Sequence, residues 1–304
     1  MSPVAPPARH PVRDHLELVR APAVLTVLGD TVAGASAAGL PVAGRRALLP
    51  LASACLYAGG MALNDWADRD LDAVERPERP VPSGRIGAGR ALGVAAGLGA
   101  AGLALAAAGG GRRALAVAGP LAACVWLYDA RLKDTAAGPV AMAACRGLDV
   151  LLGAGVGHLR AAAPAAAALA AHTAGVTVLS RGEVHGTGRG VAAAALAGSA
   201  AVAAAALARS AGAVPRRGST ALATAGAVAA YLAHCLPAQG RAARTRTAGA
   251  ARAATGAGIR AMIPLQAAWT ARAGRPGAAL ALGGVAAAGA LLRRATGARA
   301  VSET

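Results

Sequence analysis

Acidic side chains are concentrated in one short stretch of this chain. Six of its 14 acidic residues (four Asp and two Glu) fall between Asp65 and Glu78, and most of the sequence on either side is Ala, Gly, Val and Leu. Carboxylates in such apolar surroundings are costly unless they bind something positive. The stretch is therefore the first candidate for a functional site.

Helical periodicity brings most of these carboxylates together. On a helix over 64–72, one narrow face carries Asp65, Asp68 and Asp72, with the amide of Asn64 at its edge. Asp70 points to the opposite side. Oxygen ligands suit a hard cation, and Mg²⁺ typically takes one or two protein carboxylates together with substrate phosphate and water. The pattern predicts a magnesium–diphosphate site; a solvated loop helix is the alternative.

A rigid loop follows the acidic stretch at 79–84, with the sequence Arg-Pro-Val-Pro-Ser-Gly. Its two prolines and its glycine end the helix. An arginine held on such a loop can bind phosphate oxygens bidentately. Arg79 is therefore a candidate diphosphate ligand, and an arginine that only sets membrane topology is the alternative.

A second polar stretch, at 128–134, holds Lys133, the only lysine of the chain. A lysine at a membrane border commonly anchors its helix, but arginine takes that position elsewhere in this sequence. Lys133 is thus a candidate point charge for phosphate, with Asp129 placed to orient the lysine. Asn64 is likewise the only asparagine, and both single copies fall in polar stretches.

Two further charges stand inside an apolar window at 138–157. Arg146 and Asp149 are three residues apart, so they can neutralise each other on one helix face. A structural ion pair and a contact to a second substrate both fit this spacing. The four cysteines lie singly in apolar windows without CxxC spacing, which favours core packing over metal or disulfide roles.

The rest of the chain has the composition of a membrane protein. It is 56% hydrophobic and 15% charged, with mean hydropathy +0.49, whereas roughly 25% of residues are charged in soluble domains. Apolar windows recur at 21–40, 47–63, 91–109, 114–128, 138–157, 161–179, 190–208, 219–236, 256–271 and 277–292. About 20 residues cross a bilayer, and only the window at 256–271 is weak. We expect an all-α polytopic bundle of nine or ten helices.

Charge distribution predicts how this bundle is oriented. The chain carries a net charge of +17, but its arginines sit at the ends of apolar windows without interleaved aromatics, which argues against nucleic-acid binding. The N-terminal tail and the connections after even-numbered windows hold most of the Arg and Lys, so these loops are expected to face the cytosol. Polar loops on one side only argue against a transporter. No cleaved signal peptide is expected.

The motifs resemble those of a known family. N-D-x-x-D-x-x-x-D at 64–72, followed by R-P-x-P-S-G at 79–84, resembles the first signature of the UbiA family of intramembrane prenyltransferases. The Y-x-x-x-L-K pattern at 128–133 is similar to the family loop that supplies a cation. The resemblance implies a bundle of about nine helices around a lateral cavity, with one prenyltransferase-like domain at 20–294 between an N-terminal tail, 1–19, and a C-terminal tail, 295–304.

The resemblance also assigns roles. It implies catalytic roles for Asp65, Asp68, Asp72 and Lys133; substrate contacts from Asn64, Tyr128, Arg79 and Lys133; and Mg²⁺ ligation by Asn64, Asp68 and Asp72. The predicted substrates are a polyprenyl diphosphate and an unidentified acceptor. The predicted location is a bacterial cell membrane, with the active-site loops on the cytosolic side.

One part of the pattern departs from the family. A second acidic motif, often D-x-x-x-D, is expected after the sixth helix, but 177–186 contains no aspartate. Glu183 is the only carboxylate there and is the predicted metal ligand, with Ser180 and His185 as weaker candidates. Arg181 can replace a cation by binding phosphate directly, or this loop contacts the acceptor.

Two alternatives to prenyl transfer stay open at this point. A terpene cyclase on the same scaffold would share the ionisation step without an acceptor, although only 2% of residues are aromatic and cyclases use π faces to guide cations. A catalytically silent membrane subunit or a transporter is the alternative from another class.

Overall fold

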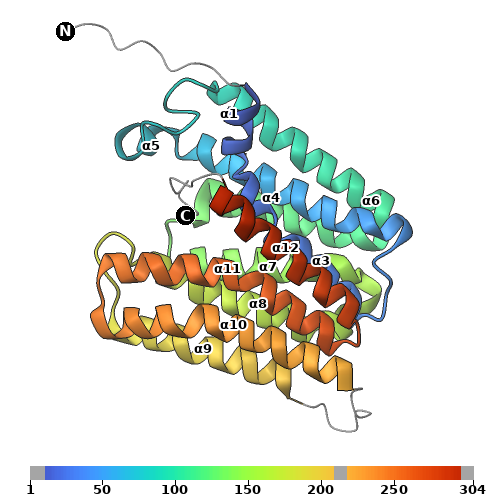
Figure 1. Ribbon diagram of the computed structural model, residues 1–304. Coiled ribbons are helices and arrows are strands. Elements are labelled where there is room, and N and C mark those ends of the chain that lie inside the picture. Colours follow the sequence, from blue (N-terminus) through green and yellow to red (C-terminus); the bar gives the residue numbers. More distant parts are fainter. Residues whose placement is uncertain (1–10, 209–217, 296–304) are drawn as a thin grey trace, which may run out of the picture.

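The computed structural model describes residues 11–208 and 218–295, and this part of the chain contains helices and loops but no strand (Figure 1). The helices are α1 (Pro11–Leu18), α2 (Ala21–Val24), α3 (Leu28–Ala37), α4 (Leu48–Ala67), α5 (Arg69–Glu75), α6 (Ala88–Leu127), α7 (Gly138–Ala154), α8 (Leu159–Ser180), α9 (Arg189–Leu207), α10 (Gly218–Thr245), α11 (Ala248–Arg272) and α12 (Pro276–Ala295). The predicted all-α class is confirmed. The ends of both predicted tails, 1–10 and 296–304, lie outside the described residues.

Helix α6 is a pair of antiparallel helices. Gly111 leaves the helical conformation, with φ 63° and ψ −158°. Gly99 and Trp126 would be about 40 Å apart on one straight helix, yet a Cβ at Gly99 would lie 3.9 Å from Trp126 Nε1. The chain therefore turns back at Gly111, where a positive φ is cheap only for glycine. The windows predicted at 91–109 and 114–128 are separate helices joined by this turn.

Several helices are long and apolar enough to cross a membrane. Length and composition select five segments among the described residues, or six if the bent pair Pro11–Leu18 and Ala21–Ala37 forms one span. One of the five, Ala88–Leu132, includes the turn at Gly111. The membrane class is thus supported, while the count of nine or ten crossings stays a prediction.

The polar loops after the even-numbered windows gather at one end of the bundle, where α5 also lies (Figure 1). Three contacts link them in order: the Lys133–Asp68 ion pair, the hydrogen bond from Arg181 to the Thr135 carbonyl, and the 3.0 Å bond from Thr187 N to the Arg246 carbonyl. The predicted grouping of these loops is therefore observed. Their cytosolic orientation remains a prediction.

Helices α3 and α7 approach each other closely through glycine. A Cβ at Gly34 would lie 1.8 Å from the Val150 carbonyl oxygen, and a Cβ at Gly153 would lie 2.0 Å from the Thr31 carbonyl oxygen. Small residues at such contacts let helix backbones approach within a membrane. Asp30 lies one turn before Gly34, so this contact sets how α3 presents Asp30 to α7.

We expect Gly34→Ala to destabilise the bundle by about 2 kcal/mol or more, because the new methyl group collides with backbone that cannot rotate away. Thermal unfolding of the purified protein in detergent measures the effect. Gly97→Ala is the matched control, since Gly97 is helical with nothing within 4 Å of its Cβ position. An equal effect of the two substitutions would contradict the close approach of α3 and α7.

Candidate active site

The acidic stretch folds as a helix with one interruption. Helix α4 ends at Ala67, Asp68 has φ −88° and ψ 2°, and α5 begins at Arg69. The helical spacing of hydrogen bonds nevertheless continues, from Asp68 N to the Asn64 carbonyl at 2.9 Å and from Asp72 N to the Asp68 carbonyl at 2.7 Å. The interruption therefore leaves the order of side chains around the helix intact.

Burial separates the predicted face from the opposite one. Asp65 and Asp72 are each 3% exposed, and Asp68 is partly buried. The Asp70 side chain is 87% exposed and pairs with its neighbour Arg69, at 3.4 Å. The predicted geometry of the stretch, with Asp70 pointing away, is confirmed.

Two arginines converge on the buried carboxylates from different parts of the chain. Arg79 Nη1 lies 2.7 Å from Asp72 Oδ2 and 3.6 Å from Asp65 Oδ1. Arg20 Nη2 donates to Asn64 Oδ1 at 3.2 Å and lies 3.3 Å from Asp65 Oδ1. The predicted Arg79 is thus joined by Arg20, whose position before Pro22 at the entry of the first apolar window fits either a side chain that faces the cavity or a membrane anchor.

Arg20 reaches the cluster through an uncommon backbone conformation. It lies between α1 and α2 with φ 48° and ψ 52°, a left-handed region that costs a residue other than glycine about 1–2 kcal/mol. Helix α1 is in turn fastened by Arg85, which bonds Asp14 at 2.6 Å and Glu17 at 2.8 Å. Hydrogen bonding to Glu17 is the main cause that raises the pKa of Arg85. The strained turn is therefore fixed by the contacts of Arg20 with the outer carboxylates and by the contacts of Arg85 with α1.

Lys133 completes the ring of basic side chains. It follows a π-helical turn, Tyr128–Leu132, and its ammonium group pairs with Asp68. On the same turn, Asp129 accepts a 3.4 Å hydrogen bond from Asn64 Nδ2. The single lysine and the single asparagine of the chain both lie in this cluster, which we call the outer cluster: Arg20, Asn64, Asp65, Asp68, Asp72, Arg79, Asp129 and Lys133.

The loop after α8 approaches the outer cluster through Arg181, which donates to the Thr135 carbonyl two residues beyond Lys133. Glu183 has a buried carboxylate oxygen without a hydrogen-bond partner, and its carbonyl accepts from Arg252 at 3.0 Å. Within the described residues, no hydrogen bond or ion pair joins Glu183 to the aspartates. Ser180 bonds its own helix, and His185 is exposed. Metal ligation by Glu183 stays a prediction.

The donor set of the outer cluster suits a hard divalent cation that brings further ligands with it. Within the described residues, no three acidic, His or Cys side chains stand close enough to hold a metal by themselves. The available donors are carboxylate and amide oxygens, and each carboxylate already faces a positive group. Mg²⁺ needs only one or two protein carboxylates when phosphate and water supply the rest. The residues therefore fit Mg²⁺ bound together with a diphosphate.

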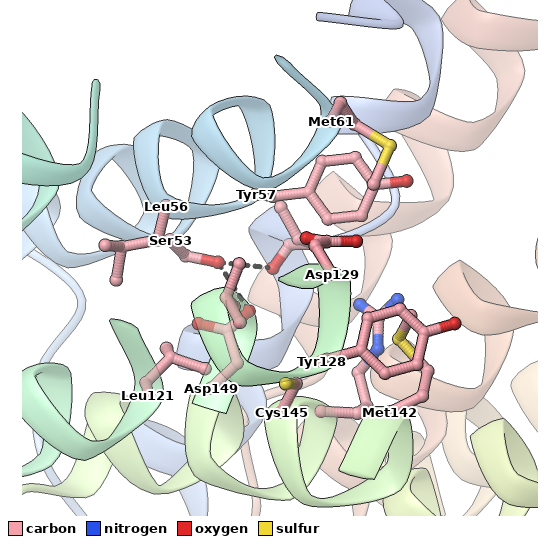
Figure 2. Close-up of a pocket in the computed structure, with 13 residues that line it drawn as sticks. Ser53, Leu56, Tyr57, Met61, Leu121, Tyr128, Asp129, Met142, Cys145 and Asp149 are labelled. Carbon is pink, nitrogen blue, oxygen red and sulfur yellow. Dashed lines mark hydrogen bonds between the residues drawn. The ribbon is translucent and has the colours of Figure 1, made fainter. Parts of the chain in front are cut away.

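A pocket opens beside the outer cluster, with about 540 Å³ of space when its open mouth is included. Tyr57, Tyr128 and Asp129 line one side of it, and Ser53 and Asp149 line the other (Figure 2). The remaining lining is mainly aliphatic and sulfur-containing. Two of the three tyrosines of the chain are in this lining. The pocket therefore offers an apolar chamber directly beside a cluster of charged side chains.

The ion pair predicted between Arg146 and Asp149 is wrong, because Arg146 pairs with Asp30 instead. Arg146 Nη1 lies 2.5 Å from Asp30 Oδ2, across the contact between α7 and α3. Gln266 Nε2 donates to the other oxygen of Asp30 at 2.7 Å, and Asp149 instead accepts a 2.6 Å bond from Ser53 Oγ. The sequence reasoning missed Asp30 because a single acid inside an apolar window has no local partner, although that isolation was itself a signal.

Comparison with known proteins gives one family. The model of the UbiA prenyltransferase family matches residues 23–255. Digeranylgeranylglyceryl phosphate synthase of Methanopyrus kandleri is 39% identical over 153 residues, which cover 48% of this chain and 54% of that protein. The chain thus spans about half the length of this relative.

Two solved structures share the fold. A UbiA homologue from Aeropyrum pernix K1 superposes with TM-score 0.63 at 22% identity, over 78% of this chain and 94% of the other. A UbiA homologue from Archaeoglobus fulgidus, bound to DMAPP and Mg²⁺, superposes with TM-score 0.53 at 20% identity, over 64% and 76%. At these identities the likeness establishes the helical fold alone.

The buried pair of Asp30 and Arg146 yields a stability prediction. We expect Arg146→Met to cost about 3–5 kcal/mol, because it leaves Asp30 buried without its counterion. Adding Asp30→Asn should recover much of this loss, since the asparagine oxygen still accepts from Gln266. Thermal unfolding in detergent measures both variants. Arg160→Met, at an exposed position of α8, is the control; a double variant no more stable than Arg146→Met would contradict the pairing.

Proposed function

Because this chain belongs to the UbiA prenyltransferase family, we propose that it is a Mg²⁺-dependent prenyltransferase that ionises an isoprenoid diphosphate and passes the prenyl group to an acceptor. The observation that carries this proposal is the convergence of Arg20, Arg79 and Lys133 on the carboxylate face of α4 and α5. Such a cluster offers positive groups for phosphate oxygens and oxygen ligands for a metal in one place.

In the proposed mechanism, Arg79 and Lys133 bind the diphosphate and hold its bridging oxygen toward the pocket. Asn64, Asp68 and Asp72 would hold Mg²⁺, with Asp65 beside them; a bound Mg²⁺ supplies positive charge that stabilises the diphosphate as a leaving group. The allylic C–O bond breaks and its electron pair leaves with the diphosphate. The acceptor's nucleophile then bonds to the prenyl carbon and releases its proton.

The pocket supplies the second requirement of this chemistry. Its largely apolar lining keeps water from an allylic cation, which would otherwise be captured as an alcohol. The rings of Tyr57 and Tyr128 face the pocket (Figure 2), and π faces stabilise nearby positive charge. Tyr128 precedes Asp129 on the π turn, so the same turn that positions Lys133 also lines the pocket.

The comparisons support the part of the proposal that concerns the prenyl diphosphate and Mg²⁺. The Archaeoglobus fulgidus homologue binds DMAPP and Mg²⁺, an allylic diphosphate and the cation that the oxygen donors of the outer cluster would accommodate. Arg181, beside the turn of Lys133, is a further proposed phosphate contact. The buried oxygen of Glu183 is the proposed metal ligand at the position of the second acidic motif. We place these loops on the cytosolic face of a bacterial membrane.

Removing metal-binding carboxylates tests the proposal most directly. We expect Asp68→Ala and Asp72→Ala each to lower Mg²⁺-dependent diphosphate release by about 100-fold or more, because the leaving group loses its charge stabilisation. Release is measured with the purified protein and a panel of prenyl diphosphates, with membrane insertion checked for each variant. Asp70→Ala is the matched control and should keep most activity. Equal losses at Asp70 and Asp68 would overturn the assigned face.

A second prediction concerns Lys133. We expect Lys133→Met to raise the KM for the prenyl diphosphate and to lower kcat/KM by about 10- to 100-fold, the effect of one lost charge-assisted hydrogen bond. Arg131→Met, at an exposed position on the same turn, is the control for general loss of positive charge. If both variants behave alike, Lys133 does not bind the diphosphate.

A further inference from the structure

The end of the bundle opposite the outer cluster carries positive charge without acids. Helix α4 starts at this end after a 3₁₀-helical segment, η1 (Gly44–Ala47), and α6 turns back there at Gly111, away from α5 (Figure 1). These segments hold four arginines, which we call the far-end arginines: Arg45, Arg46, Arg112 and Arg113. The sequence has no Asp or Glu at 31–64, 79–128 or 150–182. The segments that meet at this end therefore offer no carboxylate to neutralise the arginines.

Contacts bring the two pairs of arginines to the same place, the connection between α7 and α8. Arg46 Nη2 donates to the Gly153 carbonyl at 2.5 Å. A Cβ at Gly157, four residues further along the chain, would lie 3.5 Å from Arg113 Nη1. The far-end arginines thus form one basic patch, built from η1 and the turn of α6 on either side of this connection.

The guanidinium groups of the patch are open to a ligand. Three of the far-end arginines are exposed, and Arg46 is half-buried. In the part of the chain that the structure describes, none of the four pairs with a carboxylate, whereas Arg20 and Arg79 of the outer cluster both do. Like charges gathered at the end of an apolar bundle repel one another, and an anion bound among them removes this cost.

The surroundings of the patch select an anion that also has an apolar part. The segments Gly44–Ala67 and Ala88–Leu132 are long and apolar enough to cross a membrane, so the patch lies where such helices reach the headgroups. Leu115, one turn after Arg112, and Val156, next to Gly157, are exposed. A soluble anion would leave these two side chains uncovered, whereas the acyl chains of a lipid bury them.

We propose that the far-end arginines bind the phosphate group of an anionic phospholipid, and that Leu115 and Val156 contact its acyl chains. Arginine binds phosphate oxygens bidentately, and basic pockets between membrane helices bind anionic headgroups. Helix α4 separates the patch from Asp65 by about 25 Å, so this site is distinct from the proposed diphosphate site and does not depend on the proposed function. A lipid bound there links η1, the α6 turn and the α7–α8 connection, and stabilises the bundle.

Two lipids that differ only in headgroup test the proposal. The purified full-length protein is delipidated in detergent and given dioleoyl phosphatidylglycerol, which is anionic, or dioleoyl phosphatidylcholine, which has no net charge. Native mass spectrometry measures the Kd of each lipid, and thermal unfolding measures the Tm. We expect phosphatidylglycerol to bind about tenfold or more tightly, the effect of one charge-assisted hydrogen bond, and to give a Tm about 3 °C higher. Equal binding of the two lipids overturns the proposal.

Soluble anions separate a lipid site from a site for free phosphate. Inorganic phosphate and glycerol 3-phosphate are added over the same concentration range. Neither should reproduce the rise in Tm, because neither covers the exposed apolar side chains of the patch. A full rise with either anion would show a site for a soluble phosphate and would overturn the assignment of a lipid.

Variants of the patch test where the lipid binds. Arg45→Gln combined with Arg112→Gln should weaken phosphatidylglycerol binding about tenfold or more and leave phosphatidylcholine binding unchanged. Lysine at both positions should restore most of the preference, since it keeps the charge. The matched control is Arg241→Gln combined with Arg244→Gln, two exposed arginines near the other end of the bundle on α10. An equal loss in the control would show a general attraction between a basic protein and anionic lipid, and would overturn the assigned site.

The comparison of the two lipids on the wild-type protein requires neither a variant nor prenyl transfer. It therefore decides the proposal even if a variant fails to fold, and failure of the proposed enzymatic function would leave its outcome unchanged.

Discussion

Charge compensation inside an apolar bundle is the constraint on which this structure depends. Helices rich in Ala, Gly, Val and Leu offer carboxylates no solvent, so each buried acid needs a partner from another part of the chain. Asp65 is held by Arg20 and Arg79, which come from opposite sides of α4 in the sequence. Asp30 is held by Arg146, which follows it by more than one hundred residues. These pairs fix the α1–α2 turn, the 79–84 loop and α7 against the central helices.

The outer cluster and the pair of Asp30 and Arg146 differ in whether a bound molecule can replace their partners. The basic groups of the outer cluster belong to a turn and two loops at the end of the bundle, where a diphosphate can take the place of carboxylate partners and a metal can take the place of the basic ones. The pair of Asp30 and Arg146 lies between packed helices, and the close approach of Gly34 to α7 leaves it no room to separate. The outer cluster is therefore suited to binding and release, whereas the inner pair provides a fixed electrostatic environment for the pocket.

The sequence predicted what is local. The spacing of Asp65, Asp68 and Asp72 is a property of one helix, so periodicity was enough to place them on one face and Asp70 on the other. The gathering of the polar loops followed from their alternation along the chain. Contacts between distant segments were not predictable in this way: Arg146 has an acid three residues away, yet its partner is Asp30. Likewise, Cys124 and Cys145, each alone in its window, have sulfur atoms 3.2 Å apart.

The side chains of the site also limit what the shared fold says about function. Solved relatives at 20–22% identity have this arrangement of helices, and a fold constrains the chemistry of a site only through the side chains placed in it. The proposed diphosphate site rests on the motif at 64–72, which is intact in the sequence and whose side chains lie together in the structure. At the other end of the pocket, Ser53 donates to Asp149, and Arg146 pairs with Asp30. The polarity of the far end of the pocket therefore depends on contacts between distant helices, which the shared fold brings together without specifying their side chains.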